Sequence, residues 1–247
     1  MRKLSKDFVP ASTRLTRILG LGLLFLSASC AKFPSSQNNF ITKRLVFTVK
    51  FAGDVHVTPV PYIYIIPLRL STVSNPTDLG PIPVTSFGGN GFVAGHCTHY
   101  IIYDPQATVN PYQIWRFSDD NLINRSQTGV AINILDPRNS GKPNTLQFEI
   151  DMSQLVATAD VDSILSIQAN ILAMDKLALS NSGHIWDALG DGRILSQDNT
   201  SFLFTLRNSR KFTNATTQVE PPDPDVRGNY DPALDIVDWT IDVRLQQ

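Results

Sequence analysis

Apolar and polar residues alternate along much of the chain. In residues 236–245 every second residue is apolar, and polar residues fill most of the positions between them. Successive side chains of a β-strand point to opposite faces, so this two-residue period predicts strands with one buried and one solvent-facing side. The pattern recurs in residues 45–51, 145–152, 164–173 and 202–206.

Four other runs are apolar on both faces. They are residues 62–70, 99–103, 112–117 and 130–135. Such runs are typical of central strands that are covered on both sides. Pro67 lacks the N–H that a central ladder needs, and therefore predicts a bulge or an edge position.

Turn residues separate these runs, and about nine strands result. This pattern predicts an all-β protein, an antiparallel two-sheet β-sandwich with at most short helical turns, one of them in residues 152–158. Residues 213–230 contain three closely spaced prolines and predict a long irregular loop.

The first thirty residues have the order of a secretory signal. Five basic residues and one acid precede an apolar run at residues 18–28. Eleven helical residues cover about 16 Å, whereas a membrane core is about 30 Å thick, so a signal peptide is favoured over a signal-anchor helix.

The apolar run ends in Leu26-Ser27-Ala28-Ser29-Cys30, which resembles a bacterial lipoprotein signal. That family prefers Leu three residues before the cysteine, whereas this chain has Ser27 there and Leu26 one step earlier. The resemblance implies cleavage before Cys30 and acylation of its new N-terminus. It also implies an extracytoplasmic protein anchored in the cell envelope by lipid. Ala31 stands where an Asp would retain such a protein on the inner membrane, so an outer membrane is the expected destination if the host has one.

These observations divide the chain into a signal peptide (1–29), a lipidated cysteine with a flexible tether (30–42) and a single β-sandwich domain (43–247). Residues 1–29 hold five of the 21 Lys+Arg and one of the 22 Asp+Glu, so the remainder carries a net charge of −5. Nucleic acid is therefore not an expected partner, and membrane contact should come from the lipid. With Cys30 lipidated, Cys97 has no disulfide partner.

His96, Cys97 and His99 form the first group of candidate residues. On a strand, Cys97 and His99 would share one face and could supply two ligands to zinc or copper, but a structural zinc site needs four. The alternatives are a small buried thiol beside a half-buried histidine, which is favoured, and a Cys/His nucleophile.

A group of aspartates near the C-terminus forms the second. These are Asp223, Asp225, Asp231 and Asp235. Several carboxylates on one loop suit calcium, although the spacing is not that of an EF-hand. The favoured alternative is that they cap turns around prolines.

Aromatic side chains of the middle strands form the third. Tyr62, Tyr64, Tyr103 and Trp115 would offer a stacking platform for a sugar or a partner if they lined one exposed face. The favoured alternative is packing in the core.

No local catalytic motif occurs, so the expected function is a non-enzymatic module. Residues 62–103 also resemble uncharacterised bacterial β-sandwich lipoproteins, and more distantly sandwich modules that bind sugars or haem. We expect binding of a glycan, a small ligand or an envelope protein through end loops 74–98 and 213–235. The alternatives are an Asp-dependent hydrolase of envelope glycans and a structural subunit of an envelope assembly.

Overall fold

The computed structural model describes residues 42–55, 62–84, 90–176, 185–189, 201–220 and 231–246, all of which belong to one structural unit, Phe40–Gln247. The predicted signal peptide and Cys30 lie outside the described residues. Within the described residues, no helix is long and apolar enough to cross a membrane.

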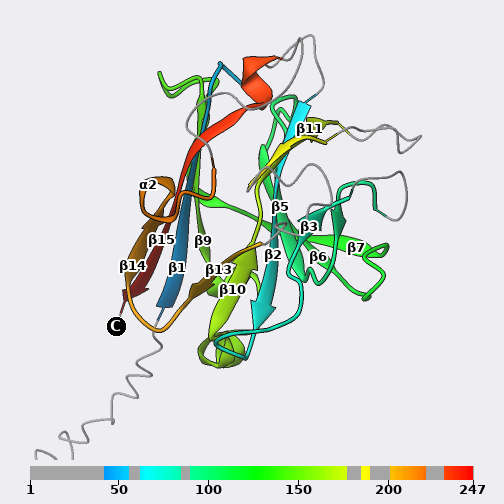
Figure 1. Ribbon diagram of the computed structural model, residues 1–247, viewed down its shortest axis with the longest axis vertical. Coiled ribbons are helices and arrows are strands. Elements are labelled where there is room, and N and C mark those ends of the chain that lie inside the picture. The colour runs from blue at the N-terminus through cyan, green and yellow to red at the C-terminus, as the bar shows by residue number, and fades with distance from the viewer. Residues whose placement is uncertain are drawn as a thin grey trace, which may run out of the picture. The chain divides into compact units, whose positions relative to one another are not determined.

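Two antiparallel sheets form the predicted sandwich (Figure 1). The five-stranded sheet has the order β14 (Arg210–Thr213), β15 (Ile236–Gln246), β1 (Thr42–Phe51), β9 (Thr145–Asp151) and β8 (Ile132–Leu135). The first strand, β1, therefore lies in the middle, antiparallel to both β15 and β9.

The eight-stranded sheet packs against the first. Its main path is β12 (Ile185–Ala188), β11 (Leu172–Asp175), β2 (Tyr62–Ser71), β5 (His99–Tyr103), β6 (Tyr112–Phe117) and β7 (Arg125–Val130). The other two strands are β10 (Ser166–Ala169), which pairs with β2, and β13 (Phe202–Thr205), which pairs with β10. A small separate sheet joins β3 (Ile82–Pro83) to β4 (Val93–Ala94).

The core between the sheets is rich in aromatic rings. Phe47 of β1 stacks on Phe148 of β9 with ring centroids 5.2 Å apart. Tyr112 of β6 lies 5.2 Å from Phe148 and so joins the two sheets. Phe47 and Phe148 are fully buried, as the alternating pattern predicts, and burial of such a ring contributes about 1.5–3 kcal/mol.

A second apolar cluster covers the outer face of the eight-stranded sheet. It includes Phe92, Tyr100 and Phe117, and Trp115 packs against it. Tyr100 and Trp115 are stacked cross-strand neighbours on β5 and β6, with ring centroids 6.1 Å apart. This cover explains why β2, β5 and β6 are apolar on both faces.

The prediction for residues 130–135 is wrong. The chain here leaves the edge of one sheet as β7 and enters the edge of the other as β8. Ile132 and Ile134 are 36% and 43% exposed, so residues 130–135 do not form a doubly covered strand. Asn133, at φ +46°, interrupts the extended backbone between them.

Pro67 is also placed differently from the prediction, because β2 is an interior strand without a register shift against β5. The irregularity lies in its other neighbour, where β10 ends and β11 begins. The Asn170 N–H donates to the Pro67 carbonyl at this junction, so the missing donor falls where the ladder is already broken.

The expected polar face of residues 164–173 is buried rather than open. Ser166, Gln168 and Asn170 are covered by the chain after β2, and Gln168 accepts a hydrogen bond from Arg69. Interruptions such as the one between β10 and β11 divide predicted strands into shorter ones. The described part of the chain therefore contains fifteen strands, above the predicted nine.

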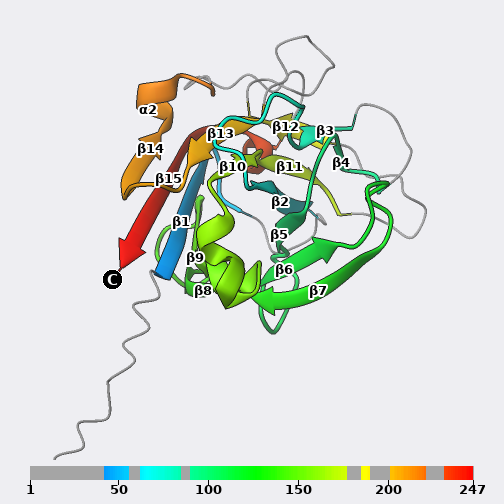
Figure 2. The same ribbon diagram turned by 90° about the horizontal axis from the view of Figure 1, so that it is seen from below.

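Short helices lie at the ends and at one edge of the sandwich. η3 (Pro232–Leu234) lies at the upper end in Figure 1, whereas η1 (Met152–Gln154) and η2 (Thr158–Ser163) lie at the lower end. α2 (Asn214–Thr217) follows β14. Seen from below, η1 and η2 lie over the opening between the two sheets (Figure 2).

Candidate functional site: a cavity at the lower end of the sandwich

A cavity of about 470 Å³ lies where β2, β5 and β6 meet the segment that carries η1 and η2. Ligand pockets in proteins commonly have volumes of about 300–1,000 Å³. Its lining comprises Leu70, Cys97, Thr98, His99, Arg116, Phe117, Ser118, Asp119, Asp120, Leu155, Val156, Ala157, Asp160 and Ile164. Apolar and charged side chains are thus mixed in one wall.

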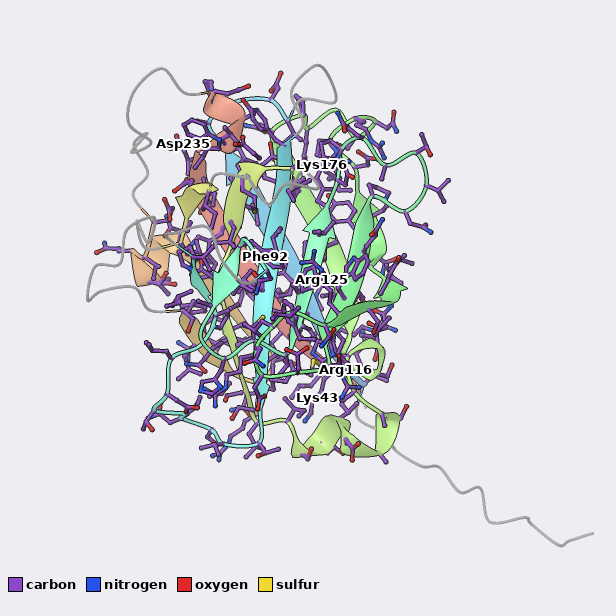
Figure 3. All side chains as sticks on the ribbon, turned by 90° about the vertical axis from the view of Figure 1, so that its right-hand side faces the viewer. Lys43, Phe92, Arg116, Arg125, Lys176 and Asp235 are labelled. Atoms are coloured by element: carbon purple, nitrogen blue, oxygen red, sulfur yellow. The ribbon has the colours of Figure 1, made fainter. Side chains whose placement is uncertain are left out.

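Two polar residues of the sheet wall occupy core-facing positions. His99 and Arg116 are cross-strand neighbours and continue the inward rows of Ile101 on β5 and Ile114 on β6. At the end of the sheet these positions carry polar groups, of which His99 is buried and Arg116 is exposed to solvent. Figure 3 shows Arg116 toward the same end as Lys43, near the helical segment.

Thr98 fixes the position of His99. Its N–H donates to the Leu68 carbonyl over 2.9 Å, and its carbonyl accepts from Phe117 N–H over 3.0 Å. Its hydroxyl accepts from Leu70 N–H over 3.1 Å. Residue 98 is therefore hydrogen-bonded to both β2 and β6, and the imidazole that follows it has little freedom.

His99 is 3% exposed, and its two ring nitrogens differ. Nδ1 lies 3.1 Å from Thr98 Oγ1, whereas Nε2 makes no hydrogen bond with any described residue. Burial, with Arg116 adding to it and the Leu155 backbone opposing it, lowers the pKa of His99 to about 4. The ring is therefore neutral at neutral pH.

The covering segment is fixed at both of its helical turns. Asp151 and Gln154 form a capping box at η1, and Gln154 Nε2 donates to the Val130 carbonyl over 2.8 Å. At η2 the Lys43 ammonium donates to the carbonyls of Val161 and Ile164 over 2.9 and 3.4 Å. These hydrogen bonds fix the lower wall of the cavity in place.

Three aspartates line the cavity and differ in their contacts. The Asp119 carboxylate accepts from the N–H groups of Ile123 and Asn124 over 3.1 and 2.7 Å. These bonds lower the pKa of Asp119. Among the described residues, the side chains of Arg116, Asp120 and Asp160 have no hydrogen-bond or ion-pair partner.

Cys97 lines the same cavity, but its thiol is hydrogen-bonded to backbone carbonyls. Its Sγ lies 3.2 Å from the His99 carbonyl, and burial raises the pKa of the thiol to about 12, which favours the protonated thiol over the reactive thiolate. Residues 95–98 form no strand, so the expected strand geometry for His96, Cys97 and His99 is wrong. Within the described residues, no group of three or more His, Cys, Asp or Glu could hold a metal ion.

The four aromatic residues predicted as a platform do not share an exposed face. Tyr64 and Tyr103 are fully buried between the sheets, and Tyr62 packs against the same core. Trp115 lies on the outer face of β6. The hydroxyls of Tyr64 and Tyr103 bond inside the protein, to the Ala233 carbonyl and to Asp136. Packing in the core therefore describes Tyr64 and Tyr103.

Two of the four predicted calcium ligands lie in the described residues. Asp223 and Asp225 lie outside the described residues. Asp231 caps η3 by accepting from Ala233 N–H over 3.0 Å, the role that the turn-capping alternative gives it. Asp235 is fully buried. Calcium stays a prediction, and it plays no part in the proposal below.

The described parts of the two predicted contact loops do not form one surface. Phe92 and Val93, from residues 74–98, cover the outer face of the eight-stranded sheet, whereas α2 contacts β14 and β15. Sequence reasoning singled out His99 but missed Arg116 and Lys43. Both continue core-facing rows, Arg116 after Ile114 and Lys43 before Leu45, and a charge in such a row was the available signal.

Comparison of the chain with known protein families, with curated proteins and with solved structures gives no significant match. The cavity must therefore be interpreted from its own residues.

Proposed function

We propose that this protein is a non-enzymatic, lipid-anchored module of the cell envelope that binds a sugar unit of an envelope glycan in the cavity beside His99. The observation that carries the proposal is a cavity of about 470 Å³ whose lining combines apolar side chains with Arg116 and with aspartates.

The mixed lining supports a sugar over a purely apolar ligand. Leu70, Leu155 and Ile164 provide an apolar surface for the C–H face of a pyranose ring. Arg116 and the carboxylates provide donors and acceptors for its hydroxyls.

The proposed location in the cell envelope rests on the lipoprotein-type signal and on acylation of Cys30. Two or more acyl chains give stable attachment to a membrane. Native mass spectrometry of protein extracted gently from its own membrane tests this part. A mass that starts at Cys30 and includes acyl chains supports the anchor, whereas an unmodified chain that retains Met1 contradicts it.

Binding is tested by calorimetric titration of the same preparation with glucose and with N-acetylglucosamine oligomers. We expect binding that is weakened in Arg116→Ala and unchanged in Lys211→Gln, which alters an exposed residue of β14 far along the other sheet. Equal affinity in both variants would remove the cavity from the proposal.

The same titrations distinguish binding from the alternative of glycan hydrolysis. A glycosidase acid must carry a proton when it meets its substrate, and the backbone hydrogen bonds of Asp119 favour its ionised form. We therefore expect oligomers to be recovered intact. Cleavage that is lost in Asp119→Asn would establish a hydrolase instead.

A further inference from the structure

We propose that the lower end of the sandwich docks on the membrane that holds the lipid anchor, through the loop after β2 (residues 72–79) and the turn between β13 and β14 (residues 206–210). These two segments are the docking surface, and its partner is a bilayer that contains anionic phospholipid. The inference rests on the lipid anchor of the proposed function but not on sugar binding, since neither segment lines the cavity.

The first argument is the place where the chain enters the domain. β1 begins at the lower end with Thr42, which follows Cys30 by twelve residues. At about 3.3–3.6 Å per residue, a chain of that length reaches at most about 40 Å. The lower end is therefore held within that distance of the membrane, whereas the other end of β1 lies about 30 Å further along the strand.

The register of the five-stranded sheet brings the turn beside this entry point. Arg210 of β14 is opposite Val243 of β15, which is itself opposite Leu45 of β1. Neighbouring strands lie about 4.8 Å apart, so the backbone of Arg210 is about 10 Å from the first part of β1. The turn and the loop after β2 both lie at the lower end in Figure 1.

The second argument is the chemistry of the docking surface. Val73 and Leu79 are 55% and 58% exposed. Arg207 Nη2 donates to Ser74 Oγ over 2.6 Å and so joins the turn to the loop that carries these apolar side chains. Exposed apolar groups beside arginines suit the membrane interface, where the apolar groups enter the headgroup boundary and the guanidinium groups stay with the phosphates.

The third argument is local charge. The docking surface and the adjoining Arg69 contain three arginines, at 69, 207 and 210, and one acid, Asp78, which pairs with Arg69 over 2.6 Å. Neither Arg207 nor Arg210 forms an ion pair with a described residue. The surface thus carries a net charge of +2, in a chain whose residues 30–247 carry −5. An anionic bilayer attracts this surface and repels the rest of the domain.

Two exposed valines at opposite ends of the domain test the inference on the full, acylated chain. Val73 belongs to the docking surface, whereas Val109, 72% exposed, lies in the loop between β5 and β6 at the upper end. Val73→Cys and Val109→Cys are each labelled with NBD, a fluorophore whose emission shifts to the blue when it leaves water. Cys97 is buried and does not compete for the label.

The labelled proteins are compared in vesicles of equal parts phosphatidylcholine and phosphatidylglycerol that contain lipids with nitroxide headgroups. We expect blue-shifted and quenched emission from the label at position 73, and emission as in water from the label at position 109. The reverse pattern would place the upper end on the membrane and overturn the inference.

Matched charge variants test the role of the arginines. One basic residue near an anionic surface changes binding about fivefold, so Arg207→Gln should lower the ratio of docked to undocked label at position 73 by about that factor. Added salt should have the same effect. Lys142→Gln removes an exposed charge before β9, at the upper end, and should leave the ratio unchanged. Equal losses in the two variants would contradict the docking surface.

Flotation of the same vesicles separates this inference from the proposed function. If the chain floats with the vesicles but the labels at positions 73 and 109 respond alike, the anchor stands and the docking surface is wrong. If the chain does not float with the vesicles, the anchor is wrong and the inference falls with it.

Discussion

Lys43 holds the lower wall of the cavity, and its replacement by Met tests that role. The residue lies on a core-facing position of β1 and is 6% exposed. Its ammonium donates to two backbone carbonyls, of Val161 and Ile164, and lies 3.4 Å from a carboxylate oxygen of Asp162. Methionine matches the length of the apolar stem but donates no hydrogen bond.

The expected loss follows from these contacts. A hydrogen bond to a charged group contributes about 1.5–3 kcal/mol, and the longer of the two bonds should contribute less. The ion pair adds under about 1 kcal/mol, because the side chain of Asp162 is 66% exposed. Removal of a buried ammonium offsets part of the loss. We therefore expect Lys43→Met to lower the free energy of unfolding by about 2–3 kcal/mol, or Tm by about 5–10 °C for a domain of this size.

Urea unfolding followed by circular dichroism measures the loss, and amide hydrogen exchange shows where it acts. We expect faster exchange in residues 152–164 than in β9. Asp162→Asn is the matched control, since it removes the ion pair and leaves both carbonyl contacts intact. If it destabilises the protein as much as Lys43→Met, the carbonyl contacts do not hold the segment and the reasoning fails.

Three further predictions concern buried polar groups. The buried Asp187 carboxylate of β12 accepts from Ile236 N–H of the opposite sheet over 2.7 Å, so Asp187→Asn should lower the unfolding free energy by about 2–3 kcal/mol in urea titrations; an unchanged midpoint would contradict this. Tyr64→Phe removes the 2.9 Å hydrogen bond to the Ala233 carbonyl and should cost about 1 kcal/mol, with faster hydrogen exchange at η3 as the local readout. Since the pKa of His99 is lowered from 6.5 to about 4 by burial, the unfolded chain takes up a proton first as the pH falls. Stability should therefore be complete above pH 6.5 and decline by about 3 kcal/mol toward pH 4. Urea titrations across that range should show a weaker decline in His99→Gln, and equal slopes would refute the assignment.

Much of the fold could be predicted from the sequence because the two-residue period is a local property. The inward rows of β1 and β9, with Phe47 and Phe148 at their centre, are those that the alternation indicates. The period cannot show where a strand changes sheets. Ile132 and Ile134 therefore read as core residues, although they lie on an exposed edge strand. Covering layers are equally invisible, since the cover over Gln168 comes from residues about ninety positions earlier.

The cavity could be predicted only in part. His99 stood out by its type, but its neighbour Arg116 is set by strand pairing, and Asp160 enters the wall through the path of the covering segment. The aromatic residues were informative about the fold rather than the site. Tyr64 and Tyr103 fill the space between the sheets, and their hydroxyls are satisfied by the backbone of Ala233 and by Asp136.

The central position of β1 has a consequence for how the protein folds. Its register partner is β15, with Thr42 opposite Gln246, 204 residues further along. Closing so long a loop is entropically costly, and sheets made of such distant pairings form slowly. The five-stranded sheet cannot be completed until residues 236–246 have been synthesised, because β1 pairs with β15. A ribosome-bound chain lacking residues 236–246 would expose one edge of β1, and would be open to aggregation or proteolysis until these residues emerge.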